Sequence, residues 1–374
     1  MASRRIRDRV RGLSTAGRVR KPQVNMQLRN VSYSSYYIGL AALLVLTLII
    51  SVRIGAVNIS FENIFSYLFT SKEDSIERSL FLKIRLPRVI LCAFVGAALS
   101  VSGALMQALF RNPIVEPGLV GTSSGAAFGA AFVFVMGKTL TGPLVDFIGP
   151  FMLPLFAFAG GLLATMIVYR LSNVFGKTNV NTLLLAGIAV NALANGGTGF
   201  FSYVARDPQA RSITFWNLGT LSGADWNAVY LVGISTLVGI LVALRFSKSL
   251  NALLLGETEA GYLGINTERM KVQLIILNTF IVAMATSIVG VISFLGLIVP
   301  HLLRIMKGSD NRFLIIGSAL LGAVLLNLAD MLSRVIVKPS EFPIGIITAF
   351  VGAPVFLFLL IRNSRKQQQG GFYA

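Results

Sequence analysis

The sequence has little charge. Of its 374 residues only 13% are charged, whereas a soluble globular domain carries about 25% charged residues. Hydrophobic residues make up 55% of the chain, and the mean hydropathy is +0.75. A charge deficit of this size means that most of the surface does not face water. We therefore predict a membrane protein.

Cysteine and histidine are nearly missing as well, with Cys92 and His301 as the single residue of each type. One cysteine excludes an intrachain disulfide. A zinc site needs about four ligands, and a zincin motif needs two histidines, so neither fits. Ser–His or Cys–His catalysis could use only His301. We expect no catalytic residue, no metal site and no permanently bound cofactor.

Acidic residues are scarce, with 15 Asp and Glu against 33 Lys and Arg and a net charge of +18. In a soluble protein this balance would suggest nucleic acid. Here the basic residues lie in an N-terminal arm and in short connections between apolar segments. Counted by the predicted topology, 22 lie on the inner side and 11 on the outer side. This positive-inside bias predicts cytoplasmic N- and C-termini and no nucleic-acid partner.

The sequence also lacks an ATP-binding P-loop. The triplets 137–139 and 176–178 read Gly-Lys-Thr, but the motif's first glycine is replaced by Phe132 and Leu171. ATP, if used, would therefore be hydrolysed by a partner subunit. Carboxylates buried in several spans are typical of proton-coupled carriers, and the sequence offers only Asp330, near the end of one predicted span, as such a candidate.

The apolar segments predict an all-α polytopic membrane protein, since about 20 apolar residues cross the hydrocarbon core. We divide the chain into a basic cytoplasmic arm (1–36), a transmembrane domain (37–362) and a cytoplasmic tail (363–374). Ten segments are predicted to be helices: roughly 37–53, 88–110, 116–136, 149–171, 181–204, 227–245, 270–292, 290–306 (broken around Gly290 to Gly296), 313–336 and 343–362.

Two connections are predicted to hold short helices. Residues 205–226 contain both tryptophans, Trp216 and Trp226, and aromatic residues favour the membrane–water boundary. Residues 246–268 are predicted to be cytoplasmic, with an apolar run followed by acidic residues, so a short helix on the inner surface competes with an ordinary loop.

Spacing along two of the predicted spans places residues on one helix face. Gly121, Gly125 and Gly129 recur every four residues, which favours close helix packing over substrate contact. Asp330 and Arg334 also share a face, either as a simple ion pair or as a docking contact.

Several motifs together resemble the FecCD family, permease subunits of ABC importers for ferric siderophores, haem and vitamin B12. The resemblance extends over about residues 37–362, nearly everything outside the arm and the tail. In chain order the motifs are R-L-P-R (85–88), G-A-L-M-Q-A-L-F (103–110), N-P (112–113), E-P-G-L-V-G (116–121), F-L-G-L-I-V-P-H (294–301), P-I-G (343–345) and G-A-P-V-F (352–356).

This resemblance implies a type II ABC importer permease fold, working as a homodimer in the bacterial inner membrane. Its partners would be two cytoplasmic ATP-binding subunits and a periplasmic or lipid-anchored binding protein. Ferric siderophore is the expected cargo, with haem or vitamin B12 as alternatives. A carrier driven by an ion gradient and an intramembrane enzyme are the competing classes.

The resemblance also implies roles for particular residues. It assigns binding-protein docking to Arg85, Arg88 and Arg334. It assigns ATPase coupling to a segment after the sixth predicted helix: Leu255, Gly256, Glu257, Glu259, Ala260, Leu263 and Gly264. It assigns a cytoplasmic gate to Asn112 and Ile114, and Asn179 and Asn181 are similar candidates. Pro300, His301 and Arg304 form a structural motif. The basic arm exceeds the family pattern, and either binds the headgroups of membrane lipids or is disordered.

Overall fold

The computed structural model describes residues 33–55, 67, 75–139, 148–174, 177–337 and 340–368. The chain divides into an N-terminal unit, Met1–Ser32, and a second unit, Tyr33–Ala374, which contains every described residue. The predictions made for most of the arm (1–32) and for the end of the tail (369–374) lie outside the described residues.

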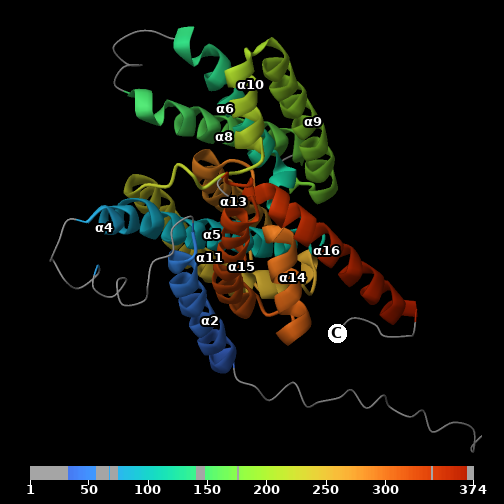
Figure 1. Cartoon of the computed structure of the whole chain (residues 1–374). Coiled ribbons are helices and arrows are strands. Elements are labelled where there is room, and N and C mark those ends of the chain that lie inside the picture. Colours follow the sequence, from blue (N-terminus) through green and yellow to red (C-terminus); the bar gives the residue numbers. More distant parts are fainter. Residues whose placement is uncertain are drawn as a thin grey trace, which may run out of the picture. The chain divides into compact units, whose positions relative to one another are not determined.

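The described residues are almost entirely helical (Figure 1). A two-residue antiparallel ladder joins β1 (Asn173–Val174) to β2 (Lys177–Thr178). The helices are α2 (Tyr33–Arg53), α4 (Ile76–Leu80), the π-helical η2 (Phe81–Arg85), α5 (Leu86–Leu109), η3 (Pro117–Val120), α6 (Thr122–Met136), η4 (Gly137–Thr139), η5 (Gly149–Phe151), α8 (Met152–Ser172), α9 (Val180–Val204), α10 (Asp207–Asn217), α11 (Trp226–Leu253), α12 (Glu257–Tyr262), α13 (Thr267–Val289), α14 (Leu295–Lys307), α15 (Asn311–Ile336) and α16 (Ile344–Gln368).

The all-α membrane fold is confirmed, and each of the ten predicted segments falls on a helix. Within the described residues, seven helices are long and apolar enough to cross a membrane, and two further apolar helices, Thr122–Met136 and Ile344–Leu359, are shorter. The thirteen residues of α14 reach only about 20 Å at 1.5 Å per residue, too short to span alone. Another helix is longer than predicted: α4, η2 and α5 form one continuous helix of 34 residues, so the R-L-P-R motif lies inside this helix and not at its start.

The predicted break between α13 and α14 is present at 290–294. Gly290 has φ 75°, and an added Cβ would lie 2.1 Å from the Trp216 carbonyl oxygen, so only glycine fits there. The backbone of Phe294 also has a positive φ, 70°, and its N–H donates to a carboxylate oxygen of Glu116 at 3.0 Å. The break is therefore fixed by contacts from two other parts of the chain.

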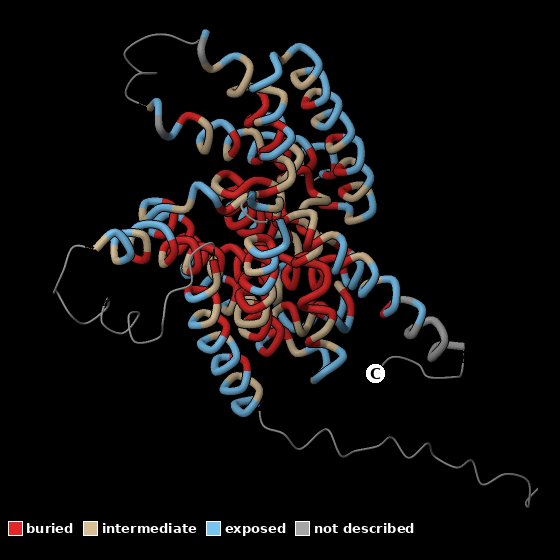
Figure 2. The backbone as a smooth tube through the Cα atoms, in the orientation of Figure 1, coloured by how far each residue is buried: buried red, intermediate tan, exposed pale blue. Residues whose placement is uncertain are grey.

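Helix α5 is the centre of one group of helices and packs against α15, α11, α14 and α13. Figure 2 shows the buried residues concentrated around it. Close approach depends on missing side chains: a Cβ on Gly96 would lie 2.3 Å from the Gly322 carbonyl oxygen, and one on Gly103 would lie 1.9 Å from that of Gly296. Small residues at such crossings let two backbones touch, as membrane helices require.

A second group consists of α6, α8 and α9, and α13 contacts α6 and α8 as well as α5. The packing role predicted for the glycines of α6 is confirmed at two of three positions. A Cβ on Gly125 would lie 2.4 Å from the Gly160 carbonyl oxygen, and one on Gly129 would lie 2.1 Å from that of Phe156. Gly121 instead begins α6 with φ 93°, so its backbone conformation is the reason for glycine there.

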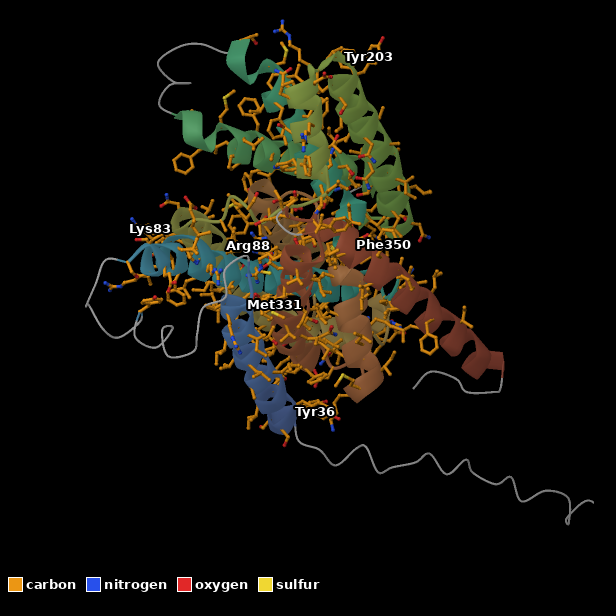
Figure 3. The ribbon with its side chains drawn as sticks, viewed as in Figure 1. Tyr36, Lys83, Arg88, Tyr203, Met331 and Phe350 are labelled. Carbon is orange, nitrogen blue, oxygen red and sulfur yellow. The ribbon has the colours of Figure 1, made fainter. Side chains whose placement is uncertain are left out.

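The connection 205–226 contains a helix, α10, as predicted. Trp216 is nevertheless buried, packed with the alanines of α6 and α8, rather than placed at a water boundary. Trp226 begins α11, and its indole N–H donates to the Leu82 carbonyl oxygen at 3.0 Å. The exposed apolar residues lie elsewhere, for example Tyr203 on α9 (89% exposed) and Phe350 on α16 (77% exposed) (Figure 3).

Candidate functional site

The three arginines predicted to dock a binding protein gather at one end of the bundle. Two of them hold the end of α2. Arg85 donates from Nη1 to the Val52 and Arg53 carbonyl oxygens at 3.3 Å, and Arg334 donates to those of Ser51 (3.0 Å) and Ile54 (2.6 Å). The last carbonyls of a helix have no intrahelical partner and carry partial negative charge, so cations stabilise them.

The third arginine, Arg88, belongs to a buried ionic cluster between α5 and α15. Its Nη2 lies 2.8 Å from Oδ1 of Asp330 and its Nη1 lies 2.5 Å from Glu341. Asp330 is fully buried and also pairs with Arg334 at 3.0 Å through Oδ2. The ion pair predicted from the four-residue spacing of Asp330 and Arg334 is therefore confirmed.

These contacts change how the docking prediction must be understood. Arg85 and Arg88 are each only 6% exposed, although Lys83, two residues before Arg85, is exposed and extends outward (Figure 3). A partner's carboxylate would have to exchange with the internal acceptors to reach them. Glu341, whose side chain is 43% exposed, was not foreseen from the sequence and is the most accessible member of the cluster.

At the opposite end of the bundle, α12 presents the predicted coupling segment. Gly256 (φ 141°) and Gly264 (φ 82°) bound this short helix, and Ala260 is buried beneath it. Leu255 and Leu263 are 69% and 65% exposed. The neighbouring Tyr262, which was not predicted, is also exposed. Contiguous apolar side chains at a polar end mark an interaction surface.

A lysine that the sequence analysis missed ties α12 to the rest of the bundle. Lys271 of α13 is buried, and its Nζ lies 2.8 Å from Glu257 of α12 and 2.9 Å from Glu268. Nζ also donates to the Thr178 carbonyl oxygen at 3.3 Å, and the Thr178 N–H donates to Glu268 at 2.7 Å. The interaction surface is thus linked to β2 through one ammonium group. A lysine inside the predicted span 270–292 was the available signal.

The same cluster borders an open cavity of about 580 Å³ at this end. Two gate candidates, Asn179 and Asn181, line it beside Glu257. The other two gate candidates do not line it: Asn112 accepts the Ile114 N–H in a local turn, and the Ile114 side chain is exposed. The structure therefore brings one pair of gate candidates to the coupling segment through this cavity, whereas the other pair does not line it.

The Pro300 motif has a clear structural role. Pro300 has no N–H, so the Gly296 carbonyl four residues earlier loses its helical partner. The Gln107 side chain of α5 donates to the Gly296 and Leu297 carbonyl oxygens, both at 3.1 Å, and Arg304 donates to the oxygen of the same amide. His301 is buried, and neither ring nitrogen has a hydrogen-bond partner among the described residues.

Replacing Gln107 with leucine should weaken the contact between α5 and α14. The change keeps the side-chain size but leaves the buried Gly296 carbonyl and Arg304 without their partner, which costs about 1–3 kcal/mol. A lower thermal unfolding temperature of the purified protein in detergent would show it. Gln107→Glu is the contrasting variant, because it keeps an acceptor for Arg304, now as a charge pair, but turns the donor into a second acceptor that faces the Gly296 and Leu297 carbonyl oxygens.

An apolar helix bundle with an exposed apolar surface at one end is typical of a membrane transport subunit that binds a partner protein. Comparison with known proteins agrees with this class. The chain belongs to the FecCD transport family, whose model matches residues 43–362. It is a permease subunit of an ABC transporter, and the ATPase is a separate subunit.

Individual relatives cover most of the chain. The hemin transport system permease protein HmuU of Yersinia pestis is 40% identical over 336 residues, 88% of this chain and 96% of the relative. The cobalamin import system permease protein BtuC of Halobacterium salinarum is 42% identical over 277 residues, 74% and 72% of the two chains. An inward-facing structure of a metal-chelate type ABC transporter superposes with a TM-score of 0.77 at 28% identity, covering 88% of this chain and 99% of that chain.

Proposed function

We propose that this chain is the permease of an ATP-driven importer for iron chelates in the bacterial inner membrane. The observation that supports this most directly is the α12 surface, where exposed leucines lie beside an ionic cluster that reaches the cavity. Each of two cytoplasmic ATPases would bind the α12 surface of one permease copy and move α12, and Lys271 would pass that movement to β2 and Asn179. The positive-inside bias of the basic residues supports a cytoplasmic position for this end.

The chain works as a homodimer in this proposal. Asn195 lies near the middle of the membrane-spanning α9 and is exposed, among exposed apolar residues such as Leu193. A polar side chain at that depth is unfavourable against lipid and usually faces another helix or water. A second copy against α9 would place Asn195 along a path between the two subunits.

The cargo is a chelate of iron, and haem has more direct support than a ferric siderophore. The hemin permease HmuU is similar over nearly its whole length, whereas the siderophore predicted from the sequence rests on the family alone. Vitamin B12 is the alternative cargo. A relative from Halobacterium salinarum is named a cobalamin import permease, and one from Vibrio parahaemolyticus is named a vitamin B12 import permease.

A periplasmic or lipid-anchored binding protein would dock at the end where Arg85, Arg88 and Arg334 gather. Acidic side chains of that protein would compete with Glu341 for Arg88, since Glu341 is the partly exposed partner. Pairing between arginine and carboxylate fixes orientation as much as affinity.

Uptake into liposomes tests the proposal. The permease would be reconstituted with its ATPase, and the binding protein would be offered with haem, ferric siderophore or vitamin B12 in turn. Uptake of one cargo that requires both ATP and the binding protein is the expected result and identifies the cargo. Uptake that needs neither, and stops when an uncoupler removes the ion gradient, would show a secondary carrier instead.

A further inference from the structure

Two neighbouring grooves at the α12 end of the bundle are lined by basic side chains. The groove between α11 and α15, about 400 Å³, is lined by Arg245, Lys248 and Arg312. The groove between α11 and α13, about 440 Å³, is lined by Arg245 and Arg269. No acidic residue lines either groove, and Arg245 lines both.

These four cations are exposed, and none of them forms an ion pair within the part of the chain that the structure describes. The carboxylates nearest in sequence have other partners. Asp310 accepts from the Asn251 amide and from a backbone N–H at the start of α15, and Glu268 is held by Lys271. Positive charge therefore remains uncompensated in both grooves.

The grooves continue an exposed apolar face of α11. Tyr230, Ile234, Leu241, Arg245 and Lys248 are separated by three, four or seven residues, so they lie on one face of the helix. The first three are at least 60% exposed, and the last two are exposed cations. This face changes from apolar to basic within about one turn. An amphiphile lying along the helix could therefore place its apolar part and its anionic part against matching side chains.

Helix α13 repeats the arrangement beside the second groove. Arg269, Gln273, Ile276 and Phe280 lie on one exposed face, again basic or polar at the α12 end and apolar further along. The start of α13 opens into this groove, because Asn266, which caps the helix, is among the lining residues. The positive end of a helix dipole adds to the attraction for an anion.

We propose that the two grooves bind the headgroup of an anionic phospholipid, with its acyl chains along the exposed faces of α11 and α13. Basic pockets between membrane helices on the cytoplasmic side suit such headgroups. A lipid with two phosphates, cardiolipin, fits best, because it can place one phosphate in each groove with Arg245 between them. Lipid binding of this kind depends on the membrane-spanning fold and not on the cargo or the transport mechanism.

The test measures lipid binding to the purified full-length permease in detergent, without its ATPase. Cardiolipin, phosphatidylglycerol and phosphatidylcholine are titrated separately, and binding is followed as thermal stabilisation. We expect affinity to fall in that order. Arg245→Gln and Arg312→Gln should each weaken cardiolipin binding by about fivefold, the value of one basic residue near a membrane surface.

Arg170→Gln is the matched control. Arg170 is an exposed arginine in the last turn of α8, before the ladder that contacts the start of α13, and it lines neither groove. Cardiolipin should bind this variant as it binds the unmodified protein. Lys248→Gln provides a further variant of the first groove if Arg245→Gln does not fold.

Four results would overturn the proposal. Cardiolipin could bind every groove variant as well as the unmodified protein, or it could bind no better than phosphatidylcholine. Excess inorganic phosphate could give the whole stabilisation by itself, which would show a site for a free anion. In a separate assembly measurement with the ATPase, Arg245→Gln could weaken assembly while lipid binding stays unchanged, which would assign the grooves to an acidic protein surface.

Discussion

Replacing Asp330 with asparagine is expected to destabilise the membrane domain by about 3 kcal/mol. Asp330 is fully buried and is shared by Arg88 and Arg334, so the neutral amide leaves two guanidinium groups without their common counter-charge. Removing one member of a buried ionic cluster costs much more than an exposed pair contributes, because the remaining charges cannot regain water. A fall in the thermal unfolding temperature in detergent, with reduced yield, would be the measured effect.

Glu341→Gln is the matched comparison in the same cluster. Its side chain is 43% exposed, so losing its pairing with Arg88 should change stability by no more than about 1 kcal/mol. The same variant should bind the binding protein more tightly, because the competing carboxylate has gone. Equal stability of the Asp330→Asn and unmodified proteins would contradict the structural role of the cluster.

The cluster also determines how docking should be tested. Reversing Arg88 to glutamate would place a third carboxylate against Asp330 and Glu341, so lost docking could simply reflect misfolding. Arg85→Gln is a milder change, because an amide can still donate to the α2 carbonyls. Weakened docking by Arg85→Gln, with an unchanged unfolding temperature, would support a direct role for this arginine.

Replacing Lys271 with methionine is expected to separate ATP hydrolysis from transport. Methionine keeps the length of the side chain but removes the charge that joins Glu257 of α12 to Glu268 and Thr178. The α12 surface itself is unchanged, so the ATPase should still bind and hydrolyse ATP. Uptake should fall by about tenfold, within the range of coupling energies between linked sites.

Lys177→Met is the control, because Lys177 lines the same cavity, is exposed and forms no ion pair with the described residues. It should keep both activities. Lys271→Arg should recover part of the uptake, since it restores the charge with a different shape. If Lys271→Met lost ATPase binding and uptake together, the lysine would only hold α12 in place, and the proposed transmission would be wrong.

The positions of the helices could largely be predicted from the sequence, because apolar length and turn residues are local properties. Glycine at positions 290 and 296 marked the break before α14, and the structure has that break at 290–294. Two predictions were wrong, one about the length of a helix and one about the burial of a tryptophan. Helix α14 is too short to span, and Trp216 is buried, because neighbouring helices supply the surroundings that a hydropathy pattern cannot describe.

The sequence by itself determined the membrane class, the family and the absence of a P-loop, since these depend on composition and on motifs read in order. The tertiary structure decided which charges are satisfied. Arg88 and Asp330 are 242 positions apart and Gln107 lies 189 positions from Gly296, so neither pairing has a local signal. The same holds for Lys271 and for the groove that Arg245 shares with Arg312: such sites depend on helices meeting in space, and only packing brings them together.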